Sequence, residues 1–363
     1  MSITSFSESE ILAMVPHRFE NILVDHTEME VSENCHIGRL SLTIGSPDRL
    51  GRQIFTKQKQ AGHYVLLSTV FMEVLAIGSI VCSNRAQPGQ LVFFAGISHF
   101  KKSGDFPVGT TVTGKVVKKK DKGGFLLCHG ELQLPSGDAI GEGDMLAYFA
   151  QDTVEQTAGP KKQINIDLSH HCSVPLVRDL NVKELYAIDE LVQLNLTHTK
   201  TPGQLLQDDR DPQVQAEPGY LKEDRKSDRY AEGIEGEDVS IVGKYTYPTT
   251  HPLIKGHFPD RPVMMGVMQW MMVEDAVLGL AQHLYATVGK TGSYIVSGHA
   301  DLVKPDKTSV CEIRGFEVQV HMKDAPYFDQ ADCIKTEKLS FRDTVSPGDT
   351  VYIRLHSLRF TPA

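Results

Sequence analysis

The sequence predicts an α+β protein that contains two copies of one unit, an antiparallel sheet packed on an apolar helix. Three observations support this prediction. Short β-branched or aromatic runs separated by turn sequences predict strands, two long apolar runs predict buried helices, and the order strand, turn, helix, strands occurs twice. With 363 residues and 40% hydrophobic content, the chain is long enough for two domains with substantial cores.

The first unit contains an apolar helix followed by several strands. Strand candidates are "LVFFAGISHF", "TTVTGKVVKKK", "GGFLLCHGELQL" and "DMLAYFA", which lie between residues 91 and 150. The helix falls in the apolar run Val65–Cys82. A membrane-spanning helix there would place Glu73 near the bilayer centre, at a cost of several kcal/mol. We therefore expect a helix wrapped by a sheet and no association with a membrane.

The chain divides into three parts at the sequence level. We expect an N-terminal domain at 1–150, a linker region with a charged and mobile loop at 151–237, and a C-terminal domain at 238–363. The last part starts a second copy of the pattern with the strand candidate "VSIVGKYTY". An insertion near 290–337 separates its helix from the following segment.

Charge and cysteine usage exclude several classes of protein. A net charge of −9 and a pI near 5.9 argue against nucleic acid as a partner. The six cysteines show no spacing typical of zinc, so no metal is expected. The first ten residues lack the basic and apolar regions of a secretory signal, and we expect a cytoplasmic protein with reduced thiols.

Four segments resemble one known family. They are "MVPHRFENILVD" from Met14, "FFAGISHFKKSGDFPVGT" from Phe93, "GHFPDRPVMMGV" from Gly256 and "LSFRDTVSPGDTVYIRL" from Leu339. These segments are similar to the signatures of the β-hydroxyacyl-acyl-carrier-protein dehydratases. The resemblance implies the hotdog fold, and two copies in one chain imply a double hotdog: two antiparallel sheets, each wrapping a long central helix, paired as a pseudo-dimer.

The resemblance also implies a catalytic pair. In the family, a histidine lies in the H-F-P turn and an acid follows fourteen residues later, and each site combines residues from two hotdog units. His257 matches the histidine, but Met271 stands at the acid position of the second copy, whereas "TVFMEVLAI" of the first copy supplies Glu73. We expect His257 and Glu73 to form one complete site. We also expect burial on an apolar helix to raise the pKa of Glu73.

The turn before the second helix is the expected substrate-binding segment. Phe258, Pro262, Val263 and Gly266 match the family motif, although Met265 replaces the usual proline. The resemblance assigns an N–H that binds the thioester oxygen to Gly266 and a backbone carbonyl that holds the histidine ring to the region of Val263. An N–H at the start of a helix suits an oxygen that gains negative charge.

A second, vestigial site is the weaker expectation. His63 precedes Glu73 by ten residues rather than fourteen, and Asp275 lies one helical turn beyond Met271. Structural roles are the simpler interpretation of both residues. Glu274 is expected to point elsewhere.

The predicted activity is dehydration of a 3-hydroxyacyl thioester to the trans-2-enoyl form, with acyl carrier protein as the partner and no cofactor. A neutral imidazole suits removal of the C2 proton, and a carboxyl group suits departure of the C3 hydroxyl as water. Alternatives stay open: enoyl-thioester hydration, dehydration with isomerisation, thioester hydrolysis, or a non-catalytic acyl-binding module of a synthase. Homodimerisation and association with other synthase components are also open.

Overall fold

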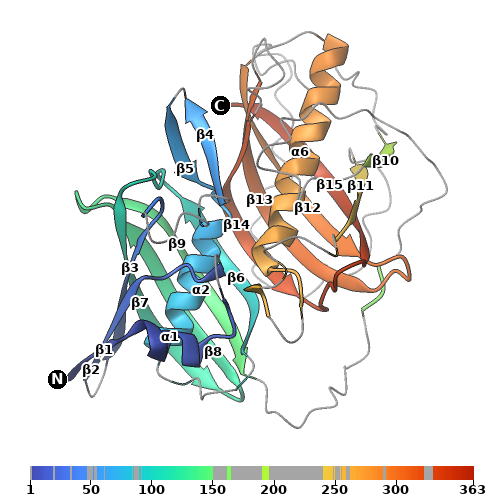
Figure 1. The fold of residues 1–363 in the computed structure, drawn as a ribbon. Coiled ribbons are helices and arrows are strands. Elements are labelled where there is room, and N and C mark those ends of the chain that lie inside the picture. The colour runs from blue at the N-terminus through green and yellow to red at the C-terminus, as the bar shows by residue number, and fades with distance from the viewer. Residues whose placement is uncertain are drawn as a thin grey trace, which may run out of the picture.

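Thirteen antiparallel strands of the described residues form one continuous sheet that wraps two helices in the computed structural model (Figure 1). The structure describes residues 2–18, 21–32, 35–46, 52, 55–60, 62–83, 85, 90, 92–149, 162–164, 190–195, 240–247, 249, 254, 256–258, 262–288, 292–322 and 330–363. Most of the expected linker, 151–237, and its charged loop lie outside these residues. None of the described helices is long and apolar enough to cross a bilayer.

The N-terminal half of the sheet has the strand order β1-β2-β3-β7-β8-β9-β6 and encloses helix α2. A separate hairpin of β4 and β5 leads into α2. The elements are β1 (Ser2–Phe6), α1 (Glu8–Met14), β2 (His26–Ser32), β3 (Cys35–Thr43), β4 (Thr56–Gln60), β5 (His63–Leu66), α2 (Val70–Cys82), β6 (Val92–Lys102), β7 (Thr111–Lys122), β8 (Phe125–Gln133) and β9 (Ala139–Phe149).

The C-terminal half has the order β14-β13-β12-β15-β11-β10 and encloses helix α6. Its elements are β10 (Glu190–Asn195), β11 (Ser240–Thr246), α6 (Gly266–Val288), β12 (Gly292–Val303), β13 (Ser309–Met322), β14 (Gln330–Phe341) and β15 (Thr350–Pro362). The region 290–337, expected as an insertion, thus supplies strands of the sheet itself, because β13 pairs with both β12 and β14.

The two halves join through β6 and β14, which pair antiparallel with Ile97 opposite Leu339. The expected double hotdog is therefore confirmed, and its two sheets are halves of a single continuous sheet. Pairing of the two central edges removes exposed strand edges where the halves meet. It also fixes the start of each helix beside the other half of the molecule.

The apolar composition of α2 and α6 explains why both helices are buried beneath the sheet. Every residue of α2 is buried, as expected of a helix that is apolar on all sides. Trp270 of α6 is fully buried, and its indole N–H donates to the Thr336 hydroxyl at 3.0 Å, which satisfies its one polar atom. Helix α1 begins with a capping box between Ser7 and Glu10 and ends just before His17.

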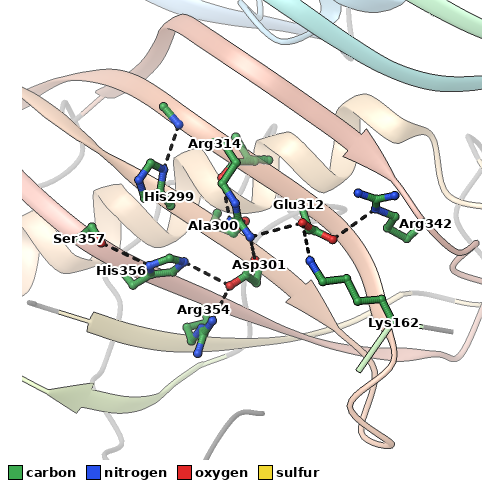
Figure 2. A network of polar contacts seen from close by, with 12 residues as sticks. Lys162, His299, Ala300, Asp301, Glu312, Arg314, Arg342, Arg354, His356 and Ser357 are labelled. Atoms are coloured by element: carbon green, nitrogen blue, oxygen red, sulfur yellow. Dashed lines mark hydrogen bonds and ion pairs between the residues drawn. The ribbon is translucent and has the colours of Figure 1, made fainter. Parts of the chain in front are cut away.

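A polar network ties together strands of the C-terminal half on the face that points away from α6 (Figure 2). The carboxylate of Asp301 on β12 is 1% exposed and contacts Arg314 at 2.8 Å, Arg354 at 2.6 Å and His356 at 3.2 Å. Burial raises the pKa of Asp301, but the bond from His356 and the Arg314 charge outweigh it and lower that pKa. Glu312 extends the network to Lys162 and Arg342.

Candidate active site

A cavity of about 590 Å³ lies where the two halves meet, and both halves line it. Glu73 on α2 and Phe93 on β6 belong to the N-terminal half. His257 and Gly266 belong to the C-terminal half. The structure therefore brings together the two residues expected to be catalytic. A site at such a boundary can contain functional side chains from both units.

His257 is fixed by its own turn. Its Nδ1 lies 3.0 Å from the Val263 carbonyl, so Nδ1 carries the hydrogen and Nε2 keeps its lone pair. The two residues share a second hydrogen bond, in which the Val263 N–H donates to the His257 carbonyl at 3.0 Å. Burial, with a smaller effect from His17, lowers the pKa of His257 from 6.5 to about 4. At neutral pH the ring is an uncharged base.

The remaining residues of the turn lie as follows. Phe258 stacks on His257 with ring centroids 4.4 Å apart and lines the cavity, as do Val263 and Gly266. A Cβ on Gly266 would lie 2.5 Å from the Phe341 ring, so any larger residue at the start of α6 requires that ring to move. Pro262 is half-buried and does not line the cavity. It lies directly before Val263, and its expected contact with substrate stays a prediction.

Glu73 lies in the first turn of α2 and is 3% exposed. Its Oε1 is 3.1 Å from Nε2 of His17. Burial raises the pKa of Glu73, but the hydrogen bond from His17 and the charges of His17 and His257 outweigh it, so this pKa lies below 4.5. The expected rise in the Glu73 pKa is therefore wrong. The side chain is suited to accept hydrogen bonds as a carboxylate.

His17 is the site residue that the sequence interpretation missed. It follows α1, is 4% exposed, and its ring centroid lies 4.9 Å from that of His257. The signal was present in the "PHRF" segment, which served only as a family signature. Arg18 explains the placement, because its backbone N–H donates to the Gly256 carbonyl at 2.8 Å and so joins "PHRF" to the "GHF" turn.

The expected second site, with His63 and Asp275, stays a prediction. His63 is exposed on β5, Asp275 is buried on α6, and neither lines the cavity. The residue that reaches the start of α2 is Glu274, whose Oε1 accepts from the Ser68 hydroxyl at 2.9 Å and the Cys333 N–H at 2.5 Å. The expectation for Glu274 was wrong because a helix advances 100° per residue, so it points along a different direction from Asp275.

A buried ionic cluster occupies the place that mirrors the cavity. Glu73 of α2 faces the start of α6, and Glu274 of α6 likewise faces the start of α2. Beside Glu274, Lys57 contacts Asp332 at 2.8 Å and Lys102 contacts Asp332 at 3.6 Å. Buried charged side chains thus surround the start of α2 on the side of Glu274.

Two histidines and a carboxylate are also donors that divalent metals accept. Donor atoms of His17, Glu73 and His257 lie within 4.8 Å of one another. Here Nε2 of His17 already contacts Glu73, and Nδ1 of His257 already contacts the Val263 carbonyl. These two hydrogen bonds suit side chains that act in acid–base chemistry. The absence of a metal from the reaction stays a prediction.

The fold and this site define a double-hotdog protein with a histidine–carboxylate centre between its halves. No family model matches the sequence. In sequence the chain is similar to 3-hydroxyacyl-acyl-carrier-protein dehydratase FabZ of Rhizobium leguminosarum bv. trifolii, with 25% identity over 156 residues, 41% of this chain and 93% of the relative. FabZ of Agrobacterium fabrum is 24% identical over 146 residues, 39% of this chain and 87% of the relative. The expected resemblance to FabZ-like dehydratases is confirmed at this low identity.

Solved structures of similar fold include two dehydratase domains. The domain from the CurF module of Curacin polyketide synthase has a TM-score of 0.41 and 9% identity, covering 95% of this chain and 100% of that domain. The domain from the CurK module has a TM-score of 0.34 and 11% identity, covering 92% of this chain and 94% of that domain.

Proposed function

We propose that the protein is a dehydratase that converts 3-hydroxyacyl thioesters on acyl carrier protein to trans-2-enoyl thioesters in fatty acid or polyketide synthesis. One observation carries the proposal: His257, uncharged at neutral pH, lies beside the Glu73 carboxylate in a cavity between the two halves. The similarity to FabZ supports the choice of substrate class.

The chemistry follows from the two side chains. Nε2 of His257 takes the proton from C2, and the electrons of that C–H bond form the C2=C3 double bond as the C3–O bond breaks. The departing oxygen receives the proton back from His257 and leaves as water. Glu73 accepts a hydrogen bond from the C3 hydroxyl, orients it toward the imidazole and stabilises the transient imidazolium. Free N–H groups at the start of α6, near Gly266, face the thioester oxygen.

The cavity lining contains both apolar and cationic side chains, which suit a carrier-bound acyl chain. Ile77, Ile80 and Tyr148 line its apolar side in the N-terminal half, where the hydrocarbon would bind. Lys162 and Arg342 line the side in the C-terminal half, where they would bind the phosphate of a phosphopantetheine arm. We expect Arg342→Gln to raise KM for carrier-bound substrate and to leave kcat within about twofold, since a phosphate contact is remote from the reacting carbons.

An assay of water loss tests the proposed function. The purified chain is incubated with 3-hydroxyacyl thioesters of several lengths on acyl carrier protein and on coenzyme A, and enoyl products are measured by mass spectrometry. We expect turnover that falls roughly 10²- to 10⁴-fold in His257→Ala and in Glu73→Gln. His63→Ala is the matched control, because this histidine is exposed and outside the cavity. Absence of turnover on every thioester would refute the dehydratase and favour a binding module, whereas full activity of His257→Ala would refute the proposed role of His257.

A further inference from the structure

We propose that His17 is a positioning residue of this site, which holds Glu73 as an ionised carboxylate oriented toward the substrate hydroxyl. The inference rests on the proposed function for the substrate, but its structural basis is independent of it. That basis is the contact of His17 with Glu73, the burial of both side chains and the backbone pairing that places them beside His257.

The polar chemistry of His17 is directed at Glu73. Its Nε2 lies 3.1 Å from Glu73 Oε1, and in the described part of the chain its buried Nδ1 has no hydrogen-bond partner. Burying an imidazole with one unsatisfied nitrogen costs free energy. Apolar residues would fill the same space at lower cost, so the contact with Glu73 is the feature that favours histidine here.

The position of His17 is set by the chain around it. Arg18 N–H donates to the Gly256 carbonyl at 2.8 Å, and Asn21 N–H donates to the Arg18 carbonyl at 3.2 Å, which closes a turn directly after His17. The His17 ring packs edge-on against Phe258, with centroids 5.6 Å apart. These contacts hold the ring rigidly, so Glu73 Oε1 is engaged and its other oxygen remains for the substrate.

Among the described residues, few charged groups face Glu73 besides the two histidines. Helix α2 carries no other charged residue between its ends. Cys128 of β8 also faces α2, but burial raises its pKa to about 12, so the thiol is uncharged. On α6, Asp275 is buried, and Glu274 is bound by Ser68 at the start of α2. Removing His17 therefore leaves Glu73 with burial as the dominant influence, which favours its protonated form.

The test compares two substitutions that differ in one property. His17→Leu removes the hydrogen-bond donor, and His17→Gln keeps a neutral donor on a flexible side chain. We expect the acid limb of the kcat profile to move to higher pH by at least about one unit in His17→Leu, because a protonated Glu73 no longer accepts from the substrate. In His17→Gln the shift should be smaller, and KM should change by less than about threefold in both variants.

His26→Leu is the matched control, because His26 also contacts a glutamate, Glu28, at 3.4 Å but on the exposed surface. Its pH profile should equal that of the wild type. A loss of activity in His17→Leu that is the same at every pH would overturn the inference, because that is the signature of a packing role. A glutamine variant as impaired as the leucine variant would overturn it as well.

Two further outcomes are distinguishable. If His17→Leu does not fold, the result for His17→Gln decides alone. The inference then requires a near-normal kcat at about pH 8 and an acid limb of the kcat profile at higher pH than in the wild type. A loss of kcat that is the same at every pH contradicts it. If the wild type turns over no thioester, the proposed function fails, and the inference is then read from infrared spectra. The protonated-carboxyl band that Glu73→Gln abolishes must appear at higher pH in His17→Gln than in the wild type.

Discussion

The backbone N–H of Arg18 donates a hydrogen bond to the carbonyl of Gly256 at 2.8 Å. This contact joins the segment after α1 to the turn before α6, although more than two hundred residues separate them in sequence. As a result, His17 and His257 lie with ring centroids 4.9 Å apart, and Glu73 contacts the first of them. Assembly of the site therefore depends on close approach of two backbones.

Gly256→Ala should disrupt this approach. A Cβ on Gly256 would lie 2.5 Å from the Arg18 carbonyl oxygen, closer than real Cβ contacts, so the two segments must separate. We expect a loss of about 1–3 kcal/mol in the free energy of unfolding, measured by urea denaturation, and a larger relative loss of kcat. Gly123→Asn is the control, since that turn glycine has φ +62 and open space around it. Normal kcat in Gly256→Ala would contradict the prediction.

This dependence explains how far the sequence could predict the site. Glu73 and His257 were found because each lies in a local motif with a known spacing. His17 was missed because its role arises from the long-range pairing of Arg18 with Gly256, and no local periodicity encodes that pairing. The predicted direction of the Glu73 pKa shift was wrong for the same reason. An apolar helix in the sequence indicates that Glu73 is buried, but it does not indicate that an imidazole lies beside it.

Acid should destabilise the protein through His257. Its pKa is about 4 in the folded protein and 6.5 when unperturbed, so between these values the unfolded chain binds a proton that the folded protein does not. Stability is therefore lost as pH falls from 6.5 toward 4. At pH 5 the loss is roughly 2 kcal/mol relative to neutral pH.

His257→Gln removes this titration. Its unfolding free energy should fall less between about pH 7 and pH 5 than that of the wild type, as measured by urea titration at both pH values. His26→Gln serves as the control, because that ring is exposed and should leave the pH dependence unchanged. Equal slopes in the wild type and His257→Gln would count against a low pKa for His257.

The mirror region shows a second limit of sequence interpretation. Strand propensity and turn signals correctly predicted β6, β7, β8, β9 and β11, because these strands alternate between buried and exposed residues or carry β-branched runs. Comparison with the family motif placed His63 and Asp275 in one vestigial site by counting positions. It did not foresee that Lys57, from the β4 hairpin, would pair with Asp332.

Lys57→Met should destabilise the fold without loss of catalysis. Lys57 is buried, contacts Asp332 at 2.8 Å and donates to the Ala331 carbonyl at 2.8 Å. Burial raises the pKa of Asp332, but the charges of Lys57 and Lys102 outweigh it and lower that pKa to about 2, so removal of Lys57 leaves a buried carboxylate without its nearest cation. Breaking such a pair costs about 3–5 kcal/mol, measurable by urea denaturation.

The control for this change is Lys335→Met, which breaks a pair with Glu317 at 2.9 Å where Lys335 is 43% exposed. Its effect should stay below about 1 kcal/mol, because solvent screens exposed pairs. Both variants should keep kcat within about twofold of the wild type, since neither lysine lines the cavity. A large loss of kcat in a folded Lys57→Met protein would mean that the cluster is coupled to the site.

Substrate length should respond to Ile80. This residue lies on α2, one helical turn beyond Ala76, and lines the cavity together with Phe125 and Tyr148. Ile80→Phe adds volume there, so long acyl chains lose space while short chains keep theirs. We expect kcat/KM to fall at least about tenfold for long 3-hydroxyacyl thioesters and to stay near normal for the shortest, because each displaced methylene costs about 1 kcal/mol. Ile80→Val should show no such selectivity. An equal fall for all lengths in Ile80→Phe, with unchanged melting temperature, would place the acyl chain at another wall of the cavity.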